Sequence, residues 1–411
     1  MQLVAYGSQD VYITGNPQIT YFKFLYKRHT NFVIEAIEHN FEGHIDFNKK
    51  ITCIIPRKGD LLYKSYLEIE FDIPKKIKNN SISNVELVKR CGLSMISYIE
   101  FEIGGQLIDK HYGEWMDIWS QLTMNRSQYQ KFERLVNTSL TKDNTYKLYI
   151  PLQFWFTKQP GLALPLIALQ FHEVKLIVKF NKYTSICKEY PNYQIPKIQK
   201  CSLFTDYIFL DTDERKRFAK NTHEYLIEQV QVGSRTELPI ARDSINLYLN
   251  LNHPCKELIW ICQSEIFRQK PTEENDNEHF EPFCYVNGNT DYGDHVKKAV
   301  LILNSNDRFY ENHGEYFRLI QPYQHHTGSF IQSLDTKECK GYIYNYSFSI
   351  NPEEYQPSGT CNFSRIDTSV LKLQLNTFNF QNSIRKYIHV YATNYNILKI
   401  NNGMGGLAYS N

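Results

Sequence analysis

The feature that most constrains the fold of this chain is an internal repeat of nearly 200 residues. Four short patterns occur twice, in the same order, with the second copy 191 to 201 residues after the first. The pairs are TNFVIEAI at Thr30 with THEYLIEQV at Thr222, LEIEF at Leu67 with LIWIC at Leu258, GEW at Gly113 with GEY at Gly314, and QPG at Gly161 with QPSG at Gly359. Solenoid repeats span only about 20 to 50 residues, so a repeat of this length indicates two copies of a whole domain.

Each copy is predicted to consist mainly of β-strands. The chain has 30 Tyr and 25 Phe among 411 residues, and aromatic side chains favour strands over helices. Many segments alternate apolar and polar residues or form short apolar runs, for example YIEFEI (98–103), VKLIVKF (174–180) and VLKLQL (370–375). A strand-rich copy of this length favours a β-sandwich or jelly roll.

One long segment has helical spacing, and one charged segment separates the copies. In residues 114–136, Trp115, Ile118, Trp119 and Leu122 fall on one face of a helix. The charged stretch DTDERKRFAKNTHE (211–224) lies between the last expected strand of copy one and the first of copy two. We therefore expect the junction of the two domains there.

Charge and cysteine content exclude several classes of protein. The 46 basic and 44 acidic residues give a formal net charge of +2, so the field is too weak for a general nucleic-acid binder. The start MQLVAYGSQD lacks the features of a secretory signal, and the apolar run 161–171 is too short to span a membrane, so a soluble cytosolic chain is expected. The nine cysteines contain no CxxC pair, which predicts reduced, packed thiols and neither a disulfide framework nor a zinc site.

Paired carboxylates are the first candidate for catalysis. Glu68 with Glu70, and Glu100 with Glu102, lie two apart, so each pair shares one face of its strand. Two carboxylates across a cleft could hydrolyse a glycoside, whereas the solvated face of an antiparallel sheet explains them more simply. Nucleophile-elbow and phosphate-loop motifs are absent from the sequence. We predict no catalytic residues and no cofactor.

Adjacent histidines and an acidic loop are the remaining candidates. His325 and His326 could bind a metal, but neighbouring residues of a strand point to opposite faces and no third ligand has a suitable spacing. A surface or loop pair of histidines, with no metal site, is the favoured interpretation. The acidic segment PTEENDNEHFEP (271–282) has the composition of an exposed, mobile insertion.

A basic aromatic segment, residues 12–32, precedes the first expected strand. It reads YITGNPQITYFKFLYKRHTNF, and such a composition can bind single-stranded nucleic acid through phosphate contacts and base stacking. Its position, after a predicted turn at Gly15-Asn16-Pro17, instead favours an arm whose aromatic residues pack against the first domain.

Six blocks of the sequence are long and unusual in composition: LVAYGSQDVYITGNPQITYFKFLYKRHTNF, IGGQLIDKHYGEW, PGLALPLIALQFHEVKL, DYIFLDTDERKRFA with HEYLIEQ, QPSGTCNFSRID and NYNILKINNGMGGLAYSN. These blocks, which run in the expected order from residue 3 to the C-terminus, closely resemble the major capsid proteins of nucleocytoplasmic large DNA viruses, especially those of algal viruses. The resemblance implies an all-β double jelly roll, with two tandem eight-stranded antiparallel sandwiches and a few short helices in loops. The expected parts are an N-terminal arm (1–24), two jelly rolls (25–211 and 225–400), a linker (212–224) and a C-terminal tail (401–411).

The same resemblance implies a structural function. Three chains would form a homotrimeric, pseudo-hexagonal capsomer of a large icosahedral shell, in contact with neighbouring capsomers, minor capsid proteins, penton proteins and, through minor proteins, an inner membrane. The protein would be assembled in the host cytoplasm and reside in the virion, with no direct contact to nucleic acid. The arm would lie at the capsid base, where Tyr12, Asn16, Lys23, Lys27 and Arg28 are the expected contact residues.

Two alternatives remain at this point. A jelly-roll protein that binds or cleaves glycans would use exposed aromatic residues with the paired carboxylates Glu68 with Glu70 and Glu100 with Glu102. A minor capsid or scaffold protein of the same fold is the second. The sequence does not assign a glycosylation site.

Overall fold

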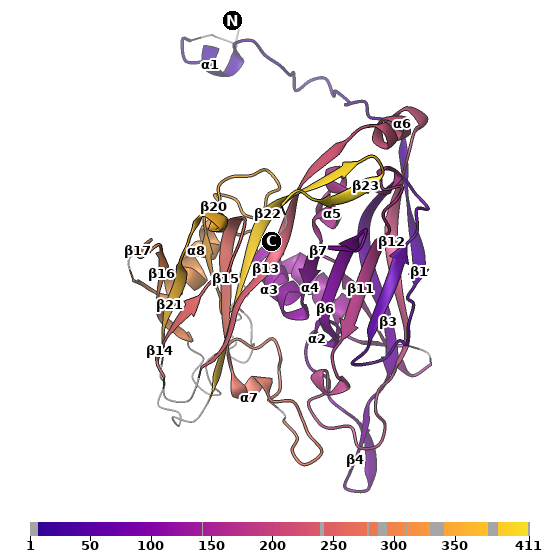
Figure 1. The fold of residues 1–411 in the computed structure, drawn as a ribbon, viewed down its shortest axis with the longest axis vertical. Coiled ribbons are helices and arrows are strands. Elements are labelled where there is room, and N and C mark those ends of the chain that lie inside the picture. Colours follow the sequence, from indigo (N-terminus) through magenta and orange to yellow (C-terminus); the bar gives the residue numbers. More distant parts are fainter. Residues whose placement is uncertain are drawn as a thin grey trace, which may run out of the picture.

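A computed structural model describes residues 7–141, 143–238, 242–277, 279–286, 294–308, 311–328, 341–376 and 385–409. Antiparallel strands are the main secondary structure, and the chain forms two β-sandwiches side by side, with helices at the join between them (Figure 1). The all-β prediction is confirmed. No described helix is both long enough and apolar enough to cross a membrane.

The first sandwich packs a larger sheet against a four-stranded sheet. The larger sheet has the order β1 (Phe32–Asn40), β12 (Ile198–Leu210), β3 (Leu61–Asp72), β9 (Thr145–Pro151) and β8 (Ser139–Leu140), with β10 (Leu164–Pro165) on β3. The facing sheet has the order β2 (Lys50–Ile55), β11 (Val174–Phe180), β6 (Ile96–Ile103) and β7 (Gln106–His111). A separate hairpin joins β4 (Lys75–Lys78) to β5 (Ser81–Asn84).

The second sandwich repeats this arrangement. One sheet has the order β13 (His223–Leu238), β22 (Lys386–Asn401), β15 (Pro254–Ser264) and β19 (Ile343–Ser347), extended by β20 (Cys361–Asn362) and β23 (Met404–Leu407). The other has the order β14 (Ser244–Tyr248), β21 (Ser369–Leu375), β16 (Val296–Leu303) and β17 (Asn306–Asp307), with β18 (Asn312–His313) also on β16. Two sheets with four principal strands each make a jelly roll.

All four sequence echoes fall on equivalent elements of the two sandwiches. TNFVIEAI and THEYLIEQV lead into β1 and β13, the first strands of their sheets, and LEIEF and LIWIC lie in β3 and β15, the third strands. GEW and GEY follow the hairpin partners of β6 and β16, and QPG and QPSG precede β11 and β21. The duplication inferred from the sequence is therefore a duplication of topology.

The helices and helical turns lie in the connections between strands. The α-helices are α1 (Val11–Thr14), α2 (Cys91–Met95), α3 (Gly113–Thr123), α4 (Arg126–Val136), α5 (Trp155–Lys158), α6 (Thr212–Lys220), α7 (Glu265–Arg268) and α8 (Gln321–His325). The shorter turns are η1 (Pro160–Leu162), η2 (Leu166–Ala168), η3 (Tyr183–Ser185) and η5 (Phe363–Arg365), and η4 (Tyr316–Ile320) is a π-helix.

The predicted long helix is two helices, α3 and α4. Asn125 begins α4 with a capping box, in which its side chain accepts a hydrogen bond from the Gln128 backbone N–H and Gln128 bonds back to Asn125. Such a cap starts a new helix, which explains why the helical pattern does not continue straight through. The predicted apolar face of α3 is confirmed, because Trp115, Ile118, Trp119 and Leu122 are buried.

The hydrophobic core crosses from one sandwich to the other. The main cluster of buried residues fills the first sandwich and continues into the second through Ile227, Ile259, Tyr391 and Leu398. A second cluster fills the interior of the second sandwich.

Six of the nine cysteines are buried free thiols, as expected, and Cys361 is a partly buried free thiol. Cys284 is disulfide-bonded, which corrects the prediction that all thiols are reduced. Cys339 lies outside the described residues.

The two segments expected to be a linker and a tail are structured. Residues 212–220 form helix α6, whose first turn is capped by the Asp211 carboxylate. The C-terminal segment turns back as β23, pairs with β22 and touches the first sandwich, where the Gly403 carbonyl accepts a hydrogen bond from the Phe171 N–H. The C-terminal segment therefore helps to hold the sandwiches together. Residues 410 and 411 lie outside the described part.

Two equivalent glycines mark the start of helical segments in the two sandwiches. A Cβ atom at Gly113 would overlap the backbone carbonyl oxygen of Leu93 and lie 2.8 Å from that of Ile96. At Gly314 it would overlap the carbonyl oxygen of Val296. The shared Gly-Glu pattern thus reflects a close backbone approach at the start of β6 and β16.

We predict that Gly113→Ala and Gly314→Ala each lower the free energy of unfolding by about 1 to 3 kcal/mol, because the added methyl forces the backbone apart. Gly161→Ala is the matched control, since nothing lies within 4 Å of its Cβ position. Thermal unfolding of the three variants is the measurement. A loss of stability in Gly161→Ala equal to the others would refute the close-approach explanation.

Candidate functional site

The N-terminal arm extends away from the body of the protein (Figure 1). Residues 7–31 contain only the short helix α1 and no strand. Tyr12 is 95% exposed and Phe22 is 100% exposed, and Phe24 and Tyr26 contact each other with ring centroids 4.9 Å apart. The expectation that the aromatic residues pack against the first domain is wrong for the single chain, because no surface within the described residues covers Tyr12, Phe22, Phe24 or Tyr26.

The five predicted contact residues are all on this arm and are all exposed. Tyr12 lies in α1, Asn16 has a left-handed backbone (φ 50°), and Lys23, Lys27 and Arg28 follow in extended chain. The left-handed Asn16 between Gly15 and Pro17 agrees with the predicted turn. The structure brings none of the five into contact with another, so they form an exposed strip and no assembled pocket.

The carboxylate pairs lie on two different sheets, and three of the four carboxylates form ion pairs with lysines. Lys147 Nζ lies 3.0 Å from Glu68 and 3.1 Å from Glu70, on the sheet that contains β3. Glu100 pairs with Lys110 at 2.9 Å, on the sheet that contains β6. Buried apolar residues of both strands alternate with these carboxylates, so each pair faces outward from its own sheet. Glu68 is only 8% exposed and the other three carboxylates are half-buried, so neighbouring side chains partly cover these outward faces.

The acidic segment 271–282 packs on the first sandwich, which corrects its interpretation as a mobile insertion. Lys76 forms an ion pair with Asp276, and Lys188 pairs with Glu281 at 3.2 Å. Phe280 is buried in the main core cluster. The segment reaches across from the second sandwich, and its acidic residues meet lysines of the first; residue 278 lies outside the described part.

Helix α3 carries the central contacts at the join between the sandwiches. Its Asp117 carboxylate is completely buried and lies 2.6 Å from the guanidinium of Arg90, which is 1% exposed. The Tyr285 hydroxyl of the second half donates a hydrogen bond to the other Asp117 oxygen at 3.2 Å, and the Phe283 carbonyl accepts one from Arg90. Burial lowers the pKa of Arg90, but the Asp117 carboxylate outweighs burial and raises it, so the guanidinium stays charged.

One turn earlier, Glu114 of α3 binds two side chains of β22. His389 Nδ1 and the Tyr391 hydroxyl both lie 2.5 Å from one Glu114 oxygen. Arg268 donates to His389 Nε2 at 3.0 Å, which places the imidazole proton on Nδ1. Burial raises the pKa of Glu114, but the contacts with His389 and Tyr391 and the charge of Arg235 outweigh it and hold the pKa at about 2. The carboxylate is therefore ionised, and one of its oxygens accepts both hydrogen bonds.

A further charged cluster joins the sandwiches near α5. Lys256 Nζ lies 2.5 Å from Glu228, and Lys158 of the first half contacts the other oxygen of the same carboxylate. Burial lowers the pKa of Lys256 despite the nearby Glu228. Sequence reasoning missed these clusters. The one available signal was the pair of acidic residues Glu114 and Asp117 inside the apolar run of the predicted helix.

His326 lies in the loop after α8, as one form of the prediction had it, but it is a buried cation and not a surface residue. Its Nε2 lies 2.9 Å from Glu257 and its Nδ1 lies 2.9 Å from Glu353. Burial lowers the pKa of His326, but the two carboxylates outweigh it and raise the pKa to about 9. His325 instead contacts the Ile350 carbonyl. Within the described residues, no group of three histidine, cysteine or acidic side chains is arranged to hold a metal.

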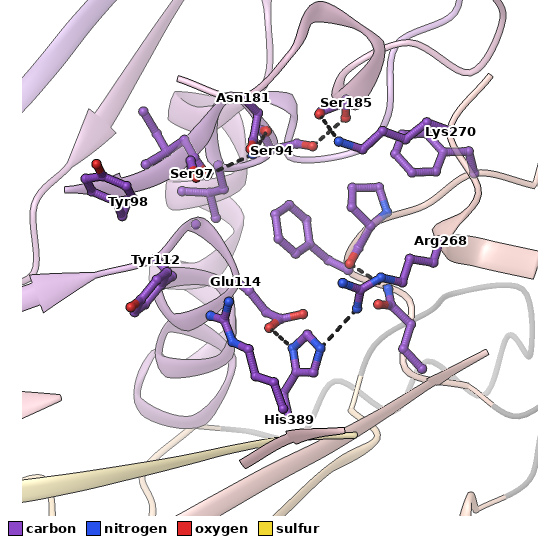
Figure 2. Close-up of a pocket in the computed structure, with 18 residues that line it drawn as sticks. Ser94, Ser97, Tyr98, Tyr112, Glu114, Asn181, Ser185, Arg268, Lys270 and His389 are labelled. Carbon is purple, nitrogen blue, oxygen red and sulfur yellow. Dashed lines mark hydrogen bonds and ion pairs between the residues drawn. The ribbon is translucent and has the colours of Figure 1, made fainter. Parts of the chain in front are cut away.

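Two hollows in the described part of the chain differ in size and in lining. The larger, about 710 Å³, is mostly apolar and is lined by Tyr66, Trp119, Met124, Leu135 and Tyr149 of the first sandwich, among others. The smaller, about 390 Å³, lies between the sandwiches and contains Glu114 and His389 (Figure 2).

Comparison with known proteins matches both halves of the chain to one group of families. Residues 20–211 match the family "Major capsid protein N-terminus", and residues 214–406 match "Large eukaryotic DNA virus major capsid protein". The chain is 42% identical to the major capsid protein of Pyramimonas orientalis virus and 38% identical to that of Paramecium bursaria Chlorella virus 1. Each match covers 100% of this chain and 99% of the relative.

Solved structures agree with this result. The quasi-atomic model of the PBCV-1 virus capsid matches with a TM-score of 0.75 and 32% identity, over 95% of this chain and 100% of the other. The Faustovirus major capsid protein shares the fold with a TM-score of 0.72 at 12% identity, over 96% and 94% of the two chains.

We predict that stability falls at alkaline pH through His326. A raised pKa means that protonation stabilises the folded state fully below the unfolded value of 6.5, and that this contribution disappears as the pH rises through about 9. The loss between about pH 7 and pH 10 should be on the order of 2 kcal/mol. Urea unfolding across this range measures it. In His326→Gln the same pH change should remove less stability; an equal pH dependence would contradict the assignment.

Proposed function

Because the chain belongs to the family of major capsid proteins of large eukaryotic DNA viruses, we propose that three copies assemble into a pseudo-hexagonal capsomer. The protein is a structural component of the virus shell and resides in the virion. Its relatives are structural proteins, and the carboxylates that could have served a glycosidase are paired with lysines on separate sheets.

The observation that carries the trimer proposal is the tandem pair of similar jelly rolls, held side by side by a buried join (Figure 1). Three such chains around a three-fold axis place six similar sandwiches in a ring, and this outline packs hexagonally. A three-fold arrangement also leaves the two kinds of sandwich free to differ, as the arm on the first and the strand β23 on the second already do. We assign the jelly rolls to residues 25–211 and 225–400.

The exposed arm is the part of the chain that we assign to contacts outside the capsomer. Its aromatic side chains are exposed and its cations Lys23, Lys27 and Arg28 have no acidic neighbour from Asn16 to Ile34 in the sequence. Large exposed apolar side chains in a row favour a protein-protein contact. We propose that the arm, through Tyr12, Asn16 and these cations, contacts neighbouring capsomers or minor capsid proteins at the base of the shell. Penton proteins, and an inner membrane reached through minor proteins, complete the proposed partners.

The trimer is tested by size-exclusion chromatography with light scattering on the purified protein. We expect a particle of three times the chain mass of 48.6 kDa, and hexagonal arrays of it by electron microscopy. A stable monomer at micromolar concentration, with no array, would refute the proposal.

Deletion of residues 1–24 tests the arm. We expect trimers to persist and shell or array formation to be impaired, because the arm makes few contacts with its own sandwich. The matched control replaces Lys23, Lys27 and Arg28 by Gln in the full-length chain, and separates the contribution of charge from that of the aromatic residues. If the truncated chain no longer forms trimers, the arm belongs to the trimer interface and not to contacts between capsomers.

A further inference from the structure

A cavity of about 390 Å³ lies between the two sandwiches and is lined by both (Figure 2). The first sandwich supplies polar groups that include Ser94, Asn181 and Ser185. The second supplies Arg268, Lys270 and His389. A ligand in this cavity would therefore touch both halves of the chain. The volume falls in the range of small-molecule sites, about 300 to 1,000 Å³.

The charge of the lining is strongly unbalanced. Three cations, Arg235, Arg268 and Lys270, line the cavity together with a single carboxylate, Glu114. That carboxylate already accepts hydrogen bonds from His389 and Tyr391. Across the described part of the chain, none of the three cations forms an ion pair with a carboxylate. Because Arg235 helps to lower the pKa of Glu114, the excess positive charge of the cavity comes from Arg268 and Lys270.

The cations are also held in place. The Arg268 guanidinium lies over the Tyr387 ring at 4.5 Å and donates one hydrogen bond to His389, which leaves its other donors available. Arg235 lies over the Tyr112 ring at 4.6 Å. Lys270 donates to the Ser185 hydroxyl at 2.6 Å, across the join (Figure 2). Donors fixed in this way lose little entropy when they bind an anion.

The pKa of Lys270 is lowered, which is the direction expected for a cation without a counter-charge. Burial lowers its pKa, and repulsion from Arg268 and Lys182 lowers it further. An anion in the cavity would relieve this repulsion and pair with several donors at once. Phosphate groups suit such a site, because arginine binds their oxygens in a bidentate manner and lysine adds a point charge.

We propose that this cavity binds a small phosphate-bearing anion that connects the two sandwiches. Binding would stabilise their relative orientation, since the donors come from β13, β22, the segment after α7 and the first sandwich. Such a ligand binds the folded chain and not the unfolded one, so it raises the unfolding temperature. The lining residues lie outside the arm and within one chain, so binding here does not require the arm or a particular number of chains in a capsomer.

Calorimetric titration of the purified, assembled protein with tripolyphosphate, and separately with inorganic phosphate, tests the proposal. We expect saturable binding at one site per chain, weaker at higher salt, with a raised melting temperature. Arg268→Gln and Lys270→Gln should each weaken binding about tenfold or more, because each removes a charge-assisted contact. Lys131→Gln, on the exposed surface of α4, is the charge-matched control and should bind like the wild type.

Two results would overturn the proposal. One is the absence of saturable binding by the wild-type protein, or an equal loss of binding in Lys131→Gln, which would reduce the effect to general attraction. The other is a change of oligomer mass in Lys270→Gln without any added anion, which would indicate that an acidic side chain of another copy fills the cavity. Near-ultraviolet circular dichroism of each variant shows whether the fold is retained, and Arg268→Lys, which keeps the charge, should lose less affinity than Arg268→Gln.

Discussion

The buried contact between Asp117 and Arg90 is the interaction on which the relative placement of the two sandwiches depends. Both groups are almost completely removed from water, and a buried charge without its partners is strongly destabilising. The first half supplies the ion pair, whereas the second half supplies the Tyr285 hydroxyl and the Phe283 carbonyl that complete it. Separation of the sandwiches would therefore remove these two hydrogen-bond partners from the Asp117–Arg90 pair. It would also expose the apolar join to water.

Helix α3 concentrates these constraints in one element. Asp117 and Glu114 of this helix bind the second sandwich through polar groups, while Trp115 packs against Tyr391 with ring centroids 5.5 Å apart. Hydrogen bonds and ion pairs require particular geometries, so they select one arrangement from the many that apolar packing alone would allow. For a shell subunit this matters, because the angle between its two sandwiches sets the shape of the surface that one chain presents to its neighbours.

The surfaces that stay exposed are those whose side chains find no partner in the join between the two sandwiches. The aromatic residues of the interior and the acidic segment 271–282 are satisfied within the chain, whereas the arm before β1 finds no partner there. The hollow lined by Arg235, Arg268 and Lys270 has donors in excess of acceptors. Within the described residues, the arm and this hollow are therefore two surfaces at which other molecules are to be sought.

Much of the fold could be predicted because it depends on local patterns. The alternation of β6 and β11, the apolar face of α3 and the four echoes follow from residues close together in the chain, and each has the place in the structure that its pattern indicated. The capping box at Asn125 is also a local pattern, because Asn125 and Gln128 are three positions apart, and it marks the division of the long predicted helix into two. The limits of the two domains, and the role of Lys23, Lys27 and Arg28, stay predictions.

The site at the join could not be predicted, because its members are far apart in sequence. His389 and Glu114 are 275 positions apart, and nothing near either residue indicates the other. His326 looked like a surface residue until the fold placed Glu257 and Glu353 on its two nitrogens. The sequence by itself determined a duplicated, strand-built chain of the capsid protein family, since periodicity, turns and glycine positions are local. Only the tertiary structure decided which charges are buried together, because pairing across the join depends on how two finished sandwiches meet.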